Sequence, residues 1–352
     1  ALDLSSDTPE VAACLEGVGK AVDLQGKTEE AVEALHQAVD LRDKLGNYNR
    51  MAYLYAHLSR VHFNKSSQKA WEACQEGLKR LEGTPDSPGK ARLVAESGRT
   101  ALFQIRPFKE VNDLCQRAIR MAEKFSKLEV SADARITVAV LEMLNNNAQR
   151  SKIILEQVLV LAEENGLLNI AQRAHNNLGV TLSTLLNPAG SLKHSIQAVA
   201  IGEQIRNNYI NSLSNQVEEN IKLGNLDEPE TIIVEKIPQV DAAPKSEKER
   251  VTLVSNARIH YARGEWQTAL ENQRKSINII GQWENSPLIA NRNIELAIIS
   301  LELNHFRGQG NYSEAETALQ CNLDLNYRLH ETYCLLCTLF AQQGRLEQAK
   351  DW

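Results

Sequence analysis

The chain has 352 residues, of which 43% are hydrophobic, 24% are charged and 5% are aromatic, and its formal net charge is −6. This balance is ordinary for a folded protein, and the net negative charge without a long basic run argues against direct nucleic-acid binding. No stretch approaches the roughly 20 apolar residues that span a bilayer, so we expect no membrane contact. The low aromatic content favours many small cores over one large core.

Apolar residues recur with helical spacing, and turn-forming residues separate the periodic segments. We therefore predict antiparallel helix pairs along the whole chain. In chain order they cover 11–24 with 28–45, 50–63 with 67–82, 89–104 with 108–125, 130–145 with 148–165, 169–185 with 190–206, 209–223 with 229–236, 246–263 with 265–282, 288–305 with 312–326, and 329–343 with a helix from 346.

Small residues repeat at fixed intervals within these pairs. Gly19, Gly26, Ala31 and Ala38 are separated by the same steps as Ala257, Gly264, Ala269 and Ser276, and Gly310 with Ala315 repeats the central step. Two antiparallel helices approach closely only where their side chains are small. A glycine between them ends the first helix, because glycine adopts left-handed backbone angles at little cost.

This pattern resembles the tetratricopeptide repeat, most clearly in the segment HNNLGVTLSTLLNPAGSLKHSIQAVAI, which contains Leu178, Gly179 and Ala198. The resemblance implies an all-α fold, a right-handed superhelical solenoid of antiparallel helix pairs. The spacing from Gly26 to Gly264 accommodates units of about 40 residues, longer than the usual ~34.

A proline-containing stretch, NLDEPETIIVEKIPQVDAAPKS, interrupts the rhythm at 225–246. We predict an N-terminal solenoid of about six helix pairs at 1–224, an irregular connection at 225–246, and C-terminal repeats at 247–352 with the last repeat truncated. The connection is either a passive loop or a hinge between two solenoid halves. The start at Ala1 and the stop at Trp352 suggest a fragment of a larger protein.

Motifs for chemistry lack their required context. Gly26-Lys27-Thr28 resembles the end of a phosphate-binding loop, but Ala21 stands where that loop needs a glycine. Cys334 and Cys337 form a CxxC within a helical segment without a second pair, so we interpret them as buried packing residues. We therefore expect no catalytic residues, no metal and no cofactor. The six cysteines follow no disulfide framework, which favours a reducing, cytoplasmic location.

Binding is expected on the concave groove that the first helices of stacked pairs would line. Each candidate side chain has two readings, a solvated or inter-repeat contact and a ligand contact. Asn176 and Arg173 carry the most weight, because amides can clamp a peptide backbone and guanidinium groups bind carboxylates in a bidentate manner. The candidate residues are Tyr55, His62, Arg92, Arg99, Arg173, Asn176, Asn177, Arg258 and Tyr261.

The long units are similar to the repeat regions of large bacterial signal-transduction ATPases and transcription activators. That resemblance implies a sensor or regulatory module whose groove binds a protein, a peptide or a small-molecule inducer and which acts on other domains of the same protein. The alternative is a free-standing adaptor that assembles protein complexes. An enzyme is not expected.

Overall fold

The computed structural model describes residues 7–63, 65–281, 286–308, 312–325 and 329–350, and these residues form helices and turns without a β-strand. They divide into two compact units, unit 1 (Ala1–Asn177) and unit 2 (Leu178–Trp352), which meet within one helix. None of the described helices is both long and apolar enough to cross a bilayer.

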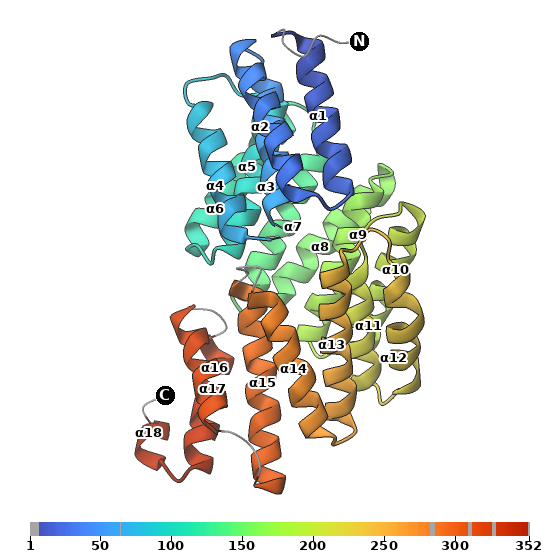
Figure 1. Cartoon of the computed structure of the whole chain (residues 1–352), viewed down its shortest axis with the longest axis vertical. Helices are drawn as coiled ribbons and strands as arrows, with labels where there is room; N and C mark the ends of the chain where they lie inside the picture. The colour runs from blue at the N-terminus through green and yellow to red at the C-terminus, as the bar shows by residue number, and fades with distance from the viewer. Residues whose placement is uncertain (1–6, 64, 282–285, 309–311, 326–328, 351–352) are drawn as a thin grey trace. The chain divides into compact units, whose positions relative to one another are not determined.

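Unit 1 is a stack of antiparallel helix pairs in which α1 packs on α2, α3 on α4, α5 on α6, and α7 on α8 (Figure 1). First helices also contact each other, since α3 packs on α5 and α5 on α7. The helices are α1 Pro9–Leu24, α2 Thr28–Lys44, α3 Tyr48–Phe63, α4 Ser67–Arg80, α5 Pro88–Phe103, α6 Phe108–Lys124, α7 Leu128–Leu144, α8 Ala148–Glu164 and α9 Leu168–Thr184.

In unit 2, α10 packs on α11, α13 on α14, α15 on α16 and α17 on α18, and Gly179 near the end of α9 lies against Ser195 of α10. Its helices are α10 Pro188–Gln204, α11 Ile210–Lys222, α12 Asp227–Thr231, the π-helix η1 Ile232–Lys236, the 3-10 helix η2 Ile237–Gln239, α13 Lys245–Ala262, α14 Trp266–Gly281, α15 Ser286–Arg307, α16 Tyr312–Asp324, α17 Leu329–Gln342 and α18 Leu346–Lys350. The helix pairs predicted from the sequence are confirmed, and their boundaries agree within two residues except at 229–236, where the α-helix ends at Thr231 and the chain continues as η1.

The segment 225–246 is packed into the core of unit 2. After α12 the chain passes through η1 and η2, and their side chains Ile232, Ile233 and Ile237 are buried against Leu213 and Val251. These isoleucines belong to one buried cluster with residues of α11 and α13, so the segment is part of the packed core. The sequence predicted a short helix here but did not predict its burial.

Close approach within a pair depends on small residues in the first helix. A Cβ atom at Gly98 of α5 would lie 2.7 Å from Sγ of Cys115 on α6, and one at Gly19 of α1 would lie 2.7 Å from the Leu35 side chain. Cys74 and Cys115 are fully buried. Cys334 is exposed, so the prediction of buried packing is wrong for it, while the half-buried Cys337 thiol donates to the Ala349 carbonyl.

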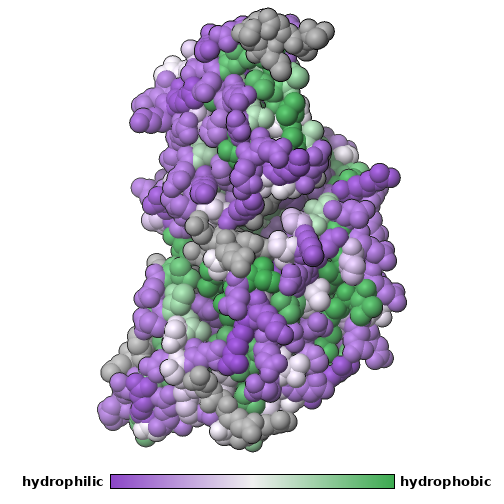
Figure 2. All heavy atoms as spheres, viewed as in Figure 1, coloured by the Kyte–Doolittle hydropathy of each residue, from purple (hydrophilic) through white to green (hydrophobic). Residues whose placement is uncertain are grey.

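Figure 2 shows hydrophilic residues over most of the visible surface, with smaller apolar patches between them. This agrees with cores that lie between the helices of each pair.

We predict that Gly98→Ala lowers the free energy of unfolding by about 1–3 kcal/mol, because the added methyl overpacks the contact with Cys115. Gly17→Ala is the matched control in α1, since nothing lies within 4 Å of its Cβ position and helix propensity alone should add about 1 kcal/mol. Urea unfolding followed by circular dichroism measures both changes. Equal stabilisation by the two substitutions would contradict the close-packing argument.

Most helices end in one repeated turn, in which the second residue after the helix has a positive φ. Gly26, Gly166 and Gly264 occupy this place, but so do Ile105 and Leu186, with φ of 53° and 58°. The following amide closes the turn in each case, as in the bond from Asn187 N to the Leu182 carbonyl. Side chains other than glycine are therefore strained at some of these turns.

We predict that Leu186→Gly raises the free energy of unfolding by about 1 kcal/mol, because glycine relieves the left-handed strain. The Leu186 side chain is 90% exposed, so almost no apolar burial is lost. Leu185→Gly, at an adjacent residue without a positive φ, should instead lower stability. The same sign for both variants in thermal unfolding would contradict the assignment of strain.

Candidate functional site

Two carboxylates lie buried beneath the first-helix face of unit 1. Glu96 of α5 is 1% exposed and Asp133 of α7 is 5% exposed. Both stand on helix positions whose neighbours are apolar, so the packing of α5 on α7 removes them from water. A buried carboxylate destabilises the fold unless cations and hydrogen-bond donors compensate it.

Guanidinium groups from three helices provide that compensation. Asp133 Oδ2 accepts from Arg60 Nη2 at 3.2 Å and from Arg92 Nη1 at 2.5 Å, and Arg173 pairs with Oδ1. Glu96 accepts from Arg60 Nε at 3.1 Å and from Arg99 Nε at 2.9 Å. We call the six residues the arginine cluster: Arg60, Arg92, Glu96, Arg99, Asp133 and Arg173.

The ion pairs keep the buried acid charged. Burial alone would raise the pKa of Glu96, but the neighbouring Arg99 and Arg60 lower that pKa from 4.5 to about 2. The guanidinium of Arg99 is in turn held 4.1 Å over the ring of Phe63, which packs edge-on against Phe103. The aromatic contact limits the rotamers of Arg99 and fixes its direction.

Positive charge exceeds negative charge in this cluster. Four guanidinium groups share two buried carboxylates, and Glu129, which accepts from Arg92 at 2.9 Å, is 52% exposed at the edge. Burial lowers the pKa of Arg173, and the charges of Arg99 and Arg60 lower it further, to about 9. Arginines that repel one another this strongly would be stabilised by an added anion.

A second cluster, in unit 2, is balanced. Arg258 of α13 lies 2.9 Å from both Glu218 of α11 and Glu295 of α15, and Arg292 lies 2.6 Å from Glu295. The pKa of Glu218 falls to about 2, chiefly because of Arg258. Lys222 pairs with both Glu218 and Glu219, so three cations of this cluster face three carboxylates. We interpret this cluster as a set of inter-repeat contacts.

The structure brings together three of the nine residues predicted from the sequence, namely Arg92, Arg99 and Arg173. Asn177 lies one turn beyond Arg173 and donates to its carbonyl, with Asn176 beside it on the half-buried side of α9. Arg258 belongs to the balanced cluster, and Tyr261 packs against the core of α14 and α15.

Two further predictions are corrected by the packing. Tyr55 is fully buried between α3 and α4, where its hydroxyl donates to Glu76 and accepts from Arg80, so we exclude it from the site. His62 is half-buried near His36 and Lys69, and burial followed by these charges lowers its pKa. It therefore faces α2 and α4 and not the arginine cluster.

Sequence reasoning missed Arg60 and Asp133. A usable signal existed, because Arg60 and Arg99 are one repeat apart, as are Asp133 and Arg173, so matching positions of successive first helices carry charged residues. The helix register had to be aligned before that signal could be seen.

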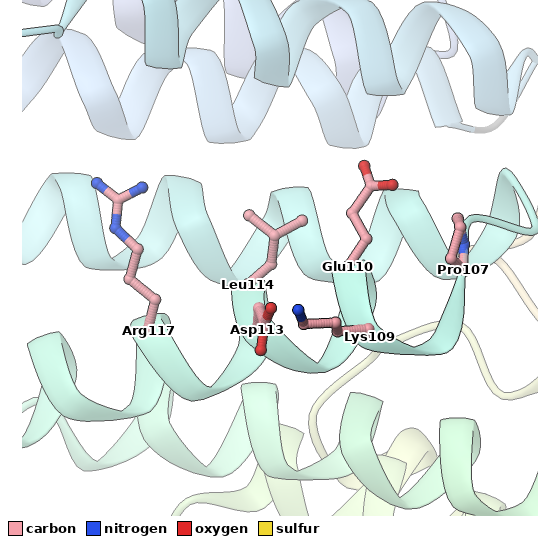
Figure 3. A pocket seen from close by; sticks show the side chains of 6 residues that line it. All are labelled: Pro107, Lys109, Glu110, Asp113, Leu114 and Arg117. Carbon is pink, nitrogen blue, oxygen red and sulfur yellow. The ribbon is translucent and has the colours of Figure 1, made fainter.

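Unit 1 has two hollows that bear on a candidate site. One, of 540 Å³, is lined by the single helix α6 and Pro107 before it. Figure 3 shows that its side chains spread along the helix without converging, and its two basic and two acidic side chains are of mixed sign. The other, of 180 Å³, is lined by side chains of α1, α3 and α5 and includes two members of the arginine cluster, Arg60 and Arg92. The smaller cavity therefore adjoins the cluster.

The sequence matches no protein-family model and no curated protein. Solved structures share its fold. The Rap conjugation gene regulator of plasmid pLS20, in complex with the Phr* peptide, has a TM-score of 0.65 and 11% identity over 92% of this chain and 98% of that chain. The quorum sensor NprR from B. thuringiensis, in its apo form, has a TM-score of 0.56 and 14% identity over 94% and 96%.

A third similar structure belongs to a longer protein. The signal transduction ATPase with numerous domains and a tetratricopeptide repeat sensor, from Pyrococcus horikoshii, has a TM-score of 0.53 and 15% identity over 88% of this chain and 49% of that chain. At these identities the likeness establishes the fold. The chain is a tetratricopeptide-like α-solenoid, as its repeat pattern predicted.

We predict that Glu96→Gln lowers the free energy of unfolding at neutral pH by about 3 kcal/mol, because it breaks a buried ion pair. The pKa of Glu96 is depressed on folding, so its carboxylate stabilises the native state above pH 4.5, and this contribution disappears as the pH falls toward 2. The variant should lack that part of the pH dependence in urea titrations. Glu129→Gln, which removes a half-exposed pair, should change stability by only about 0.5 kcal/mol. Identical acid profiles for wild type and Glu96→Gln would refute the role of Glu96.

Proposed function

We propose that this chain is a peptide-binding regulatory module, that its first-helix face in unit 1 is the binding surface, and that it carries out no catalysis. The observation on which the proposal depends is the arginine cluster. Its arginines come from α3, α5 and α9, so a ligand that contacts all of them would touch three first helices at once.

The chemistry of this face suits an extended peptide. Arginines can bind carboxylates in a bidentate manner, and the amides of Asn176 and Asn177 on α9 offer both donors and acceptors for a peptide backbone.

Fold likeness supports the same reading. The Rap regulator of plasmid pLS20 was solved in complex with the Phr* peptide. NprR, which has a TM-score of 0.56 over 87% of this chain and 85% of that chain, was solved in complex with its cognate peptide NprX. We infer the ligand class of this chain from its own arginines and asparagines, with these proteins as structural precedents.

Regulation would follow from the repeat architecture. Each repeat contacts only its neighbours, so a ligand that bridges several repeats favours one arrangement of them. It can shift the equilibrium only by its difference in affinity for the two arrangements. In a larger signalling or transcription-regulatory protein, we propose that this shift would release or restrain an attached domain. A free-standing adaptor would use the same surface without such a domain.

We predict that Arg173→Ala weakens binding of a short linear peptide by roughly tenfold or more, since a hydrogen bond to a charged group contributes about 1.5–3 kcal/mol. Asn176→Ala should weaken it as well. The probe is a mixed-sequence library of fluorescent linear peptides, from which the best-retained sequence is titrated by fluorescence anisotropy. Circular dichroism should show both variants folded.

Arg135→Ala is the matched control, because Arg135 of α7 pairs with Glu123 of α6 and not with the arginine cluster. Its affinity should equal that of the wild type. Unchanged affinity in Arg173→Ala and Asn176→Ala alike would exclude this face as the binding surface.

A further inference from the structure

The cavity of 180 Å³ in unit 1 is lined mainly by cationic and polar side chains. Lys20 comes from α1, Arg50, Tyr53, His57 and Arg60 come from α3, and Arg92 comes from α5, with Leu54 and Ala56 completing the wall. At about 30 Å³ for each water molecule, its volume equals that of a few waters. It can therefore hold one small group and not a folded element.

Lys20 has no ion pair in the part of the chain that the structure describes. Its neighbour Arg50 pairs with Glu16 on α1, with Nη2 at 2.5 Å from Oε2, but Arg42 takes the other oxygen of Glu16 at 2.8 Å. One buried carboxylate is thus shared between two guanidinium groups. The cavity wall has more positive charge than its own acids can balance.

The buried carboxylates next to the cavity do not neutralise this excess of positive charge. Glu96 and Asp133 form ion pairs with Arg60 and Arg92, but they also form ion pairs with Arg99 and Arg173 of the arginine cluster. Around the cavity and the arginine cluster, positive side chains outnumber carboxylates. The positive side chains are Lys20, Arg42, Arg50, Arg60, Arg92, Arg99 and Arg173. The carboxylates are Glu16, Asp23, Glu96, Glu129 and Asp133.

The remaining polar lining favours a carboxylate. Burial lowers the pKa of His57, so its imidazole is neutral at pH 7 and can donate one hydrogen bond. The ring of Tyr53 and the Leu54 side chain give an apolar wall for a short aliphatic stem. Because the whole chain has a net charge of −6, it would repel a polyanion at long range, which disfavours a nucleic acid.

We propose that this cavity is a carboxylate subsite, which receives an acidic side chain or the C-terminal carboxylate of the bound peptide. Lys20 and Arg50 face the carboxylate from α1 and α3, while Arg60 and Arg92 connect the subsite to the arginine cluster. This inference rests on the peptide-binding function proposed above and specifies the chemistry of its ligand.

The test uses peptides that differ only in one carboxylate. A positional library is prepared with Glu or Gln fixed at each position in turn, once with a free and once with an amidated C-terminus. For wild type we expect tighter binding of a Glu peptide than of its Gln partner, or of a free C-terminus than of its amide. A preference for Glu over Gln indicates that an acidic side chain occupies the subsite. A preference for the free C-terminus over its amide indicates that the C-terminal carboxylate occupies it.

Lys20→Gln should reduce affinity for the preferred peptide by roughly three- to fivefold, the effect of one partly exposed charge pair, and should leave the uncharged partner unaffected. Lys20→Glu should reduce it further, and added salt should weaken wild-type binding. Because Lys20 forms no described ion pair, neither change is expected to unfold the chain. Lys79→Gln on α4, outside the cavity lining, is the control and should bind as wild type.

Failure of the subsite and failure of the function give different results. Equal binding of charged and uncharged peptides, both weakened by Arg173→Ala, would overturn the subsite and leave peptide binding intact. If wild type retains no peptide, the function fails, and the subsite is tested by the melting temperature with N-acetylglutamate amide against N-acetylglutamine amide. A rise with the first compound that is lost in Lys20→Gln supports the subsite, and equal effects overturn it.

Discussion

The structure depends on the close approach of the two helices in each pair. At Gly19, Gly98 and Gly179 of the first helices, a Cβ atom would lie within 3 Å of the Leu35 side chain, the Cys115 sulfur and the Ser195 hydroxyl, respectively. These contacts fix where the second helix lies, and the repeated turn with a positive φ fixes where the first helix ends. In unit 1 the first helices begin at Pro9, Tyr48, Pro88, Leu128 and Leu168, so equivalent positions recur at 39 to 40 residues. Uniform spacing of backbones brings matched side chains of neighbouring repeats together.

Because the repeats are evenly spaced, polar residues that are about one repeat apart in the sequence contact each other. Arg80 pairs with Asp40 in unit 1, and Arg258 pairs with Glu218 in unit 2. Such pairs stabilise little by themselves, because desolvation offsets most of the Coulomb attraction. What distinguishes the two clusters is charge balance. In unit 2 the named carboxylates match the cations in number, whereas in unit 1 the guanidinium groups outnumber the buried carboxylates. Burial, together with the charges of nearby arginines, lowers the pKa of one arginine in each unit, to about 9 for Arg173 and to about 10 for Arg292. An energetically unfavourable excess of like charge marks a functional surface better than the mere presence of polar residues does.

The sequence predicted the fold well because the fold follows from local signals. Small residues, helix periodicity and turn residues act within one pair, and the pairs were located accurately without any alignment. The residues of the candidate site were harder to predict from the sequence. Arg92, Arg99 and Arg173 were found because charged residues on a first helix are unusual, but Tyr55 was misplaced, since its burial depends on Gly77 of α4 approaching its ring. Asp133 and Arg60 were missed because their importance comes from pairing across three helices. To predict that pairing, one must know how each helix is oriented about its own axis. The spacing of small residues does not determine this orientation.

A ligand that supplies negative charge would act on both the charge balance and the mechanics of unit 1. A carboxylate bound beside Lys20 and the arginine cluster would offset the mutual repulsion of the guanidinium groups. Part of its binding free energy would therefore come from reducing that repulsion. The same contact would involve α1, α3 and α5, of which α3 and α5 already pack on each other. Binding energy would therefore be converted into a preferred arrangement of successive repeats, because only that arrangement keeps the cations together. A neutral ligand of the same shape would occupy the surface without this coupling. Charge in the ligand is thus what would make binding regulatory.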